Sequence, residues 1–526
     1  MTVRLSALVL SVIAFSAVAC EVSTGDDSED GDAKGGRSGS SDAGSGNDPS
    51  AGEAGSDSGS NTTGGRPSQQ PDDEPAEAGS GGEPQQPDEP GEPDEEPDTD
   101  PPPSSSETAR FFLPMTEPTN TSAPTIELDA KGGIHAVYPR YVIGGAFYAY
   151  CAGSCETDED MSVVEFETDG TVHNAMLALD KAGHPRVLLS TMSKVYYASC
   201  DSNCGVQSSW ETSEILDHGG DREVTGEAFA VDPDGNLRFL MHTYRAYLGI
   251  GQKPRHTWYL ACDGDCQDPA SWNESQIADQ TWEGTHLRYD ARGVAHIATV
   301  ANVEEEGVVT KKLGAYLECA EACETEDNWV GAGLYEAYED EIEVVAMKPT
   351  VSMALTSDGK PRVVVLGKNA EGNRNIVYFE CEEDCTQDNW LGSIISDHEK
   401  ITTGLDLALD KAGRPRIAYT LDYNIALAYC DGGNCAGENA SWDLTKVEFG
   451  SDMPPDEIFL WDNCTVGFWF LHNPSLAIDA NGAPRVGYQA RDISGGVSNP
   501  DPTRPDCVAG TDMTWSRISV MSSYKE

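Results

Sequence analysis

The sequence predicts an all-β chain that folds as a seven-bladed β-propeller with four-stranded antiparallel blades, preceded by a disordered linker. The first observation is a unit that recurs between residues 126 and 488: an apolar run, a tight turn, and a basic residue that begins a second apolar run. The turn-opening residues are spaced by 51 to 69 residues, at Asp129, Asp180, Asp232, Asp290, Thr356, Asp410 and Asp479. A repeat of this length made of short strands is typical of radial architectures, because one unit cannot bury its own faces.

The second unit shows how each repeat supplies four strands. An apolar run from Leu177 to Asp180 is followed by a turn with Gly183 and by a returning run, 186–190. A third run, 194–199, ends at Cys200, and a fourth begins near Trp210. Four antiparallel strands joined by turns are the make-up of a propeller blade.

The second observation is that cysteines recur with the repeat. The short-spaced pairs are Cys151 with Cys155, Cys200 with Cys204, Cys262 with Cys266, Cys319 with Cys323, Cys381 with Cys385, and Cys430 with Cys435. Zinc would require four ligands that converge, and no histidines stand at matching positions, so we expect disulfides and no metal. Cys464 and Cys507 remain in the irregular seventh unit, and we expect them to pair with each other.

Aromatic and basic residues also recur, and both series have two interpretations. The tyrosines (Tyr148, Tyr197, Tyr259, Tyr316, Tyr378) and tryptophans (Trp210, Trp272, Trp329, Trp390, Trp442, Trp515) could stack on sugars. We expect them instead to pack between neighbouring blades, where large rings bury the most apolar area. The basic residues (His135, Arg186, Arg238, His296, Arg362, Arg416, Arg485) could form an anion-binding circle. We expect each to pair with the acidic residue six positions earlier, which the fifth unit lacks because it has Thr356 there.

The N-terminal part predicts export. Residues 1–19 resemble a signal peptide, with Arg4 followed by an apolar stretch too short to span a bilayer permanently. Cys20 follows Ala17-Val18-Ala19, which fits either an ordinary secretory cleavage site or a bacterial lipobox. Because the other 14 cysteines form the repeat-linked set, we favour lipidation of Cys20. The protein would then be lipid-anchored in the bacterial cell envelope, at the outer membrane or cell surface, and secreted if Cys20 is not lipidated.

Charge separates a linker from the folded part. Residues 20–107 are acidic, rich in Gly, Ser and Pro and without aromatics, which predicts a disordered stalk. The formal charge of the whole chain is −56, and residues 108–526, the predicted propeller, keep about −36 of it. This balance disfavours nucleic acids and anionic polymers as partners.

The unit Leu-x-Leu-Asp-x-x-Gly-x-Pro-Arg-x-x-Tyr at residues 407–419 resembles the propeller repeats of the sialidase-like, BNR-type family of bacterial secreted proteins. The resemblance implies the propeller fold over about 110–526. The Ser-x-Asp-x-Gly-x-Thr-Trp order of an Asp-box is absent, and no catalytic residue of a sialidase can be placed.

Strand alternation places the Asp turns and Cys turns on one face and the variable loops on the other, where binding usually occurs. Candidate ligand-binding residues on the variable face are Arg140, Tyr141, Arg245, Trp461, Trp469, His472 and Arg491. In the alternative interpretation, 458–473 is a buried insertion and the arginines pair with carboxylates. We therefore expect a cell-surface protein that binds a glycan or a protein without catalysis and without a cofactor. A glycoside hydrolase or sialidase-like enzyme on the variable face, and a purely structural envelope protein, stay open as alternatives.

Overall fold

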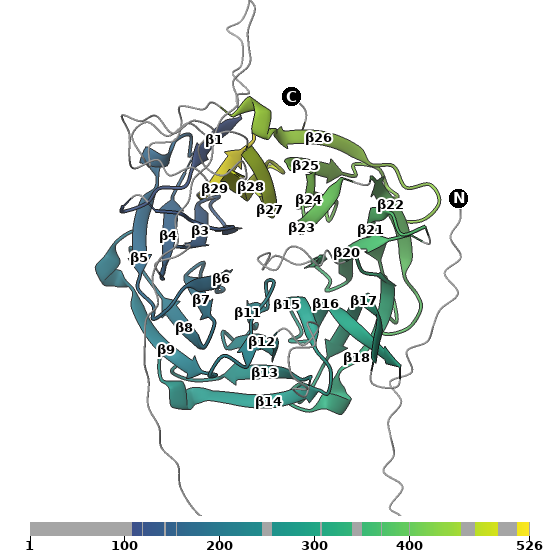
Figure 1. The fold of residues 1–526 in the computed structure, drawn as a ribbon, viewed down its shortest axis with the longest axis horizontal. Helices are drawn as coiled ribbons and strands as arrows, with labels where there is room; N and C mark the ends of the chain where they lie inside the picture. The colour runs from purple at the N-terminus through teal and green to yellow at the C-terminus, as the bar shows by residue number, and fades with distance from the viewer. Residues whose placement is uncertain are drawn as a thin grey trace, which may run out of the picture. The chain divides into compact units, whose positions relative to one another are not determined.

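The computed structural model describes residues 108–524, apart from 118, 141–143, 154, 245–254, 306–307, 339–349, 370, 399, 454–468 and 493–512. The described residues form seven antiparallel sheets arranged as a ring, with one edge strand of each sheet nearest the centre (Figure 1). The predicted seven-bladed propeller is confirmed. No helix in this part of the chain is long and apolar enough to cross a membrane.

The strands of the first two sheets follow one another along the chain from the centre outward. The first sheet contains β2 (Thr125–Leu128), β3 (Ile134–Pro139), β4 (Ala146–Cys151) and β5 (Ser162–Phe166). The second contains β6 (Val172–Leu179), β7 (Pro185–Thr191), β8 (Lys194–Ser199) and β9 (Glu211–Asp217).

The third sheet differs because its inner strand is interrupted. β10 (Arg222–Glu223) and β11 (Phe229–Val231) both pair with β12 (Leu237–Thr243), which continues to β13 (Thr257–Cys262) and β14 (Trp272–Ala278). This sheet therefore has five strands where four were expected. Glu227 lies in the interruption, next to Gly226, whose φ of +73° favours glycine.

The fourth to sixth sheets return to the regular order. The fourth contains β15 (Trp282–Tyr289), β16 (Ala295–Glu305), β17 (Val308–Cys319) and β18 (Val330–Glu336). The fifth contains β19 (Val351–Leu355), β20 (Pro361–Lys368), β21 (Arg374–Glu380) and β22 (Leu391–Asp397). The sixth contains β23 (Ile401–Leu409), β24 (Pro415–Leu421), β25 (Asn424–Tyr429) and β26 (Asp443–Glu448).

The seventh sheet is completed by the beginning of the folded chain. Its strands β27 (Trp469–Ile478), β28 (Pro484–Asp492) and β29 (Met513–Val520) come from the C-terminal part, and β1 (Ala109–Phe112) pairs with β29 as the outermost strand. Trp515 lies on β29, the third strand of its sheet, whereas the other recurring tryptophans stand at the start of a fourth strand or just before it. Trp515 is therefore not equivalent to the other members of the tryptophan series. The irregularity of this unit follows from a fourth strand that comes from the other end of the chain.

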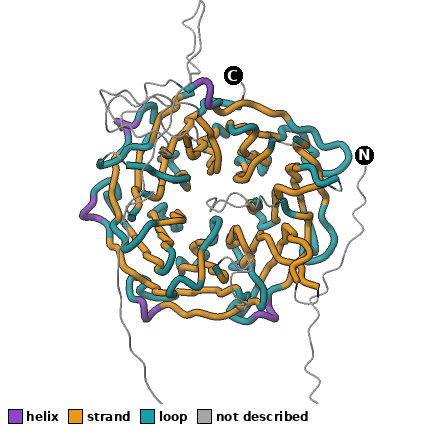
Figure 2. Tube along the Cα trace, viewed as in Figure 1, coloured by secondary structure: helices purple, strands orange, loops and turns teal. Residues whose placement is uncertain are grey.

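Short 3-10 helices lie at the rim of the ring (Figure 2). They are η1 (Asp158–Asp160), η2 (Gln207–Ser209), η4 (Pro269–Ser271) and η5 (Glu326–Asn328), each just before a fourth strand, and η6 (Gly450–Asp452), which follows β26.

The core is a series of apolar clusters between neighbouring sheets. One of them joins Val137 and Tyr148 of the first sheet to Leu177 and Tyr196 of the second. The apolar faces of each sheet are thus buried by the next sheet around the ring, as the repeat predicted.

Candidate functional site

The turn-opening aspartates hold the turns through one oxygen and the basic residue through the other. In the second sheet, Oδ1 of Asp180 accepts hydrogen bonds from the backbone N–H groups of Ala182 and His184, both at 2.9 Å. Oδ2 accepts one from Arg186 at 2.7 Å. The glycine three residues after each turn opener has a φ between +76° and +91°, which favours glycine over other residues. The Asp-x-x-Gly pattern is therefore explained by turn geometry.

Four arginines pair with the turn-opening aspartate as predicted, at 2.7 to 3.1 Å: Arg186–Asp180, Arg238–Asp232, Arg416–Asp410 and Arg485–Asp479. His135 and His296 lie 3.7 Å from Asp129 and Asp290, which is too far for a hydrogen bond. Arg362, whose unit has Thr356, pairs instead with Glu382 at 2.6 Å. These basic groups connect turns within one sheet, so the anion-binding circle has no support.

Histidine replaces arginine in two units, and the contacts change with it. Arg186, Arg238, Arg362 and Arg416 each donate to the backbone carbonyl of the first cysteine of their unit. Nδ1 of His135 and of His296 instead lies 2.6 Å from a tyrosine hydroxyl, that of Tyr148 and Tyr316 respectively. Burial lowers the pKa of His135 to about 4, although Asp129 opposes this shift. Both histidines therefore act as neutral core groups near neutral pH.

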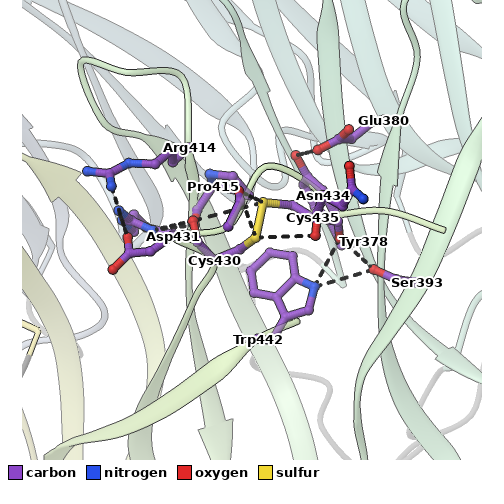
Figure 3. The surroundings of a disulfide bond; sticks show 12 residues. Tyr378, Glu380, Ser393, Arg414, Pro415, Cys430, Asp431, Asn434, Cys435 and Trp442 are labelled. Atoms are coloured by element: carbon purple, nitrogen blue, oxygen red, sulfur yellow. Dashed lines mark hydrogen bonds and ion pairs between the residues drawn. A yellow bond between two sulfur atoms is a disulfide. The ribbon is translucent and has the colours of Figure 1, made fainter. Parts of the chain in front are cut away.

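The recurring aromatic rings pack between sheets. Each repeat tyrosine contacts the tryptophan of the following unit, with ring centroids 4.6 to 6.5 Å apart. Figure 3 shows one such place, where Trp442 lies beside the disulfide of Cys430 and Cys435 and donates to the carbonyl oxygen of Cys435 at 3.0 Å. Tyr378 lies 5.1 Å from the same ring. The packing interpretation of both series is confirmed for these residues, which leaves them unavailable as sugar platforms.

The six short-spaced cysteine pairs all form disulfides, as predicted. Each bridge closes the turn between the third and fourth strands of its sheet. The bonded pairs are Cys151 with Cys155, Cys200 with Cys204, Cys262 with Cys266, Cys319 with Cys323, Cys381 with Cys385, and Cys430 with Cys435. Because these sulfurs are bonded to one another, the zinc alternative is excluded for all six pairs. Cys20 and the predicted bridge between Cys464 and Cys507 lie outside the described residues.

The predicted ligand-binding residues are placed unevenly. Tyr141, Arg245 and Trp461 lie outside the described residues. Arg140 is buried and forms ion pairs with Glu117 and Glu165. Trp469 is 4% exposed and packs against Phe112 and Trp515. These two side chains therefore agree with the alternative of buried rings and paired arginines.

His472 and Arg491 are the described candidates that lie together on the seventh sheet. They are on the adjacent strands β27 and β28, and both are half-buried. Burial, with the nearby charge of Arg491, lowers the pKa of His472 to about 4. His472 is therefore neutral at pH 7, and its Nε2 atom is buried, so it offers a ligand no charge.

A feature that the sequence analysis missed is a belt of polar residues four positions before the turn openers. Ser352, Asp406 and Ser475 each accept a hydrogen bond from the backbone N–H of the next inner strand around the ring. The three distances are 3.0, 2.7 and 3.1 Å. The belt connects the inner strands of the fifth, sixth, seventh and first sheets, and so fixes the wall of the central channel.

Two positions before the turn openers the channel wall is made mostly of alanine. Ala354, Ala408 and Ala477 line a central cavity of about 330 Å³, together with Glu127 and Arg288, which occupy the equivalent positions of the first and fourth sheets. In the second and third sheets this position is Ala178 and Ala230. The cavity lies where the inner strands lead into the Asp turns, because Leu128, Tyr289, Leu355 and Ile478 also line it. It is thus near the uniform-turn face, whereas the sequence analysis favoured the variable one.

Arg288 is the centre of a charged cluster in the channel. Its guanidinium group donates a hydrogen bond to Oε2 of Glu227 from the third sheet. Burial by itself would lower the pKa of Arg288, but Glu227, Glu127 and then Asp406 outweigh it and raise that pKa above its ordinary value. Nδ1 of His286 lies 3.7 Å from the same Glu227 oxygen. The repeat contains a signal for this cluster. Two positions before the turn openers, Glu127 and Arg288 are charged, whereas the other five units have alanine there.

Comparison with known proteins identifies no family for this chain. No family model and no curated protein match the chain. Among solved structures, the polysaccharide lyase Uly1 is 9% identical with a TM-score of 0.42, over 76% of this chain and 90% of that one. The GH93 α-L-arabinofuranosidase of Fusarium graminearum is 9% identical with a TM-score of 0.37, over 60% and 92% of the two chains. The BP39L lectin from Burkholderia pseudomallei is 10% identical with a TM-score of 0.37, over 71% and 96%.

Likeness at this level carries no argument about activity. The resemblance of the repeat to sialidase-like propellers therefore stays a prediction, and the function must be argued from the geometry of this chain.

Proposed function

We propose that this protein is a non-catalytic glycan-binding lipoprotein of the bacterial cell envelope, and that its central cavity holds the sugar. The observation that carries the proposal is the cavity of about 330 Å³ in the channel wall, lined by alanines with one carboxylate and one guanidinium group. This volume is at the lower end of the range for small-molecule sites, which is the size of a terminal sugar unit rather than of a long chain.

The lining suits a neutral sugar. Glu127 offers acceptors and Arg288 offers donors for hydroxyl groups, and the alanine and leucine side chains offer apolar contact to the C–H faces of the ring. The carboxylates of Glu227, Glu127 and Asp406 surround Arg288. These carboxylates disfavour a uronate or a sulfated sugar, because they would repel its negative charge.

The same carboxylates argue against hydrolysis in this cavity. Glycoside hydrolysis requires one carboxyl group free to give a proton and a second free to act as base or nucleophile. Glu227 accepts the hydrogen bond of Arg288. Asp406 accepts hydrogen bonds from Ser352, Leu407 and Leu476 at 2.7 to 2.8 Å. These oxygens hold the channel wall together and are not directed at a substrate bond.

The test is a glycan array probed with the full chain, with one variant that fills the cavity and one matched control. Ala354→Leu adds bulk to the cavity wall. Ala178→Leu makes the same change at the equivalent position of the second sheet, outside the cavity lining. We expect neutral glycans to bind the wild type and Ala178→Leu, and binding by Ala354→Leu to fall at least tenfold. Equal binding by both folded variants, or no glycan bound by the wild type, would reject the cavity as the site.

Catalysis is tested on the same protein with a panel of hydrolase and lyase substrates. If the wild type turns over a substrate and a single carboxylate substitution such as Glu127→Gln abolishes that turnover, the protein is an enzyme and the non-catalytic proposal is rejected.

The lipid anchor is tested separately by metabolic labelling with a fatty acid. We expect label in the wild type and none in Cys20→Ala. An unlabelled wild type would leave the protein as a secreted one.

A further inference from the structure

We propose that Glu227, His286 and Asp406 form a binding site in the central channel for a divalent transition-metal cation of the Zn²⁺ or Mn²⁺ type. One ligand atom of each residue lies within 4.8 Å of the others, and all three residues are buried, at 8%, 1% and 5% exposed. They come from the third, fourth and sixth sheets, so the ring brings together residues that are up to 179 positions apart. None of these three residues lines the proposed sugar cavity, so the metal and the sugar can be tested separately, although Arg288 contacts both sites.

The donor set indicates the class of metal. One imidazole nitrogen with two carboxylate oxygens suits first-row divalent metals, whereas Ca²⁺ and Mg²⁺ prefer oxygen ligands alone. Metal–ligand bonds of about 2.0 to 2.2 Å place neighbouring ligand atoms roughly 3.4 Å apart in a tetrahedral site. Atoms already within 4.8 Å of one another need only small side-chain movements to reach that geometry.

The surrounding hydrogen bonds hold two of the ligands in place. Asp406 is fixed by the hydroxyl of Ser352 and by the backbone N–H of Leu407 and Leu476. Glu227 is fixed by Arg288 through its side chain and by the N–H of Leu287, which donates to its backbone carbonyl at 3.1 Å. Carboxylate ligands of metal ions are commonly oriented by such outer partners.

The electrostatic environment favours a cation. Glu227, Glu127 and Asp406 all act on the single guanidinium group of Arg288. Three carboxylates near one arginine give the channel a negative potential, and the burial of Glu227 and Asp406 strengthens it.

The chain offers a matched control at its uniform-turn face. Asp180, His184 and Asp201 also bring one ligand atom each within 4.8 Å of the others. There, however, the guanidinium group of Arg186 lies 2.7 Å from both Asp180 and Asp201, and the side chain of Asp201 is 76% exposed. Both carboxylates of that cluster are thus paired with one guanidinium group, whereas in the channel Arg288 donates to Glu227 and Asp406 accepts from Ser352, Leu407 and Leu476. We therefore expect the exposed cluster to bind the metal much more weakly than the channel cluster.

The experiment uses the full chain, stripped with a chelator and titrated with Zn²⁺ and with Mn²⁺ by isothermal titration calorimetry. We expect one site that is weakened at least about 100-fold by His286→Ala and left unchanged by His184→Ala. The acidic linker should bind Zn²⁺, Mn²⁺ and Ca²⁺ weakly, and this background should be the same in the wild type, His286→Ala and His184→Ala. Equal affinities in wild type and folded His286→Ala, or no saturable site, would overturn the proposal.

A second measurement on the wild type avoids dependence on the folding of a variant. Electron spin-echo spectroscopy of the Mn²⁺-loaded protein should show modulation from one histidine nitrogen. Its absence in a protein that carries one equivalent of Mn²⁺ would also overturn the assignment of His286.

Discussion

The fully buried Arg416 gives the sharpest test of how the repeats are stabilised. Arg416 is 0% exposed, and its guanidinium group donates to Asp410, to Asp431 and to the carbonyl of Cys430 at 2.7 to 2.9 Å. Asp410 also caps its own turn, because its Oδ1 accepts the N–H groups of Ala412 and Arg414. Replacing Asp410 therefore removes two different contributions to the free energy of unfolding.

Two substitutions separate these contributions. Asp410→Ala loses the turn cap and leaves a buried guanidinium group with one carboxylate fewer. We expect a loss of about 3 to 5 kcal/mol, the usual cost of breaking a buried pair from one side. Asp410→Thr copies the natural fifth unit, where Oγ1 of Thr356 accepts the N–H of Lys360 at 2.9 Å. Asp410→Thr keeps the turn cap and loses the ion pair, so we expect its free energy of unfolding to be about 2 kcal/mol higher than that of Asp410→Ala.

The assay is chemical denaturation followed by tryptophan fluorescence, with Glu336→Gln as the control. The Glu336–Lys368 pair has a similar distance of 2.8 Å, but both side chains are 41% exposed. An exposed pair contributes about 0 to 1 kcal/mol, so the control should stay near the wild type. A change no larger for Asp410→Ala than for Glu336→Gln would refute the view that the buried pair stabilises the sixth sheet.

Three further predictions concern other parts of the ring. The lowered pKa of His135, about 4 against roughly 6.5 in the unfolded chain, contributes stability that is complete above pH 6.5 and is lost as the pH falls towards 4. The melting temperature of His135→Gln should therefore fall less than that of the wild type between pH 6.5 and 4, and parallel curves would contradict this. Replacing Cys200 and Cys204 together by alanine should lower the free energy of unfolding, measured by chemical denaturation, by about 2 kcal/mol. An unchanged free energy would show that this bridge does not constrain the unfolded chain. Phe112→Ala should lower the free energy of unfolding by about 2 to 3 kcal/mol, because the Phe112 ring packs on Trp469 and Trp515 with centroids 6.0 and 6.2 Å away. The substitution should also speed proteolysis of the chain before β2. An unchanged rate of proteolysis would mean that β1 does not close the ring.

Local patterns predicted the parts of the fold that depend on neighbours in the sequence. The Asp turns, the basic partners six residues later and the short cysteine bridges all form within one unit, so spacing alone could indicate them. The pairing of β1 with β29 could not be found this way, because Ala109 and Val520 are brought together only by closure of the whole ring. A four-residue strand carries too little periodicity to show its partner.

The channel residues were missed for a different reason. Asp406 and His286 stand in inner strands that also read as apolar runs, and their roles depend on residues from other sheets. Aligning the units would have shown both as exceptions to their own repeat. The expected site on the variable face was inferred from the diversity of the loops. Of its candidate residues, Arg140 forms ion pairs and Trp469 is part of the core.

The origin of the outermost strand of the seventh sheet has a consequence for how the chain acquires its structure. During synthesis the N-terminal part of the chain emerges first, yet β1 must wait for its hydrogen-bonding partner until residues 513–520 have also emerged. Pairing over such a long sequence separation is slow, because a large loop must be closed before the contact forms. Until then the edge of β29 and the apolar side of Phe112 are open to other chains, and a premature stop near the C-terminus would leave both exposed. Folding of this propeller is therefore completed by β1 and β29 together, once residues 513–520 have been synthesised.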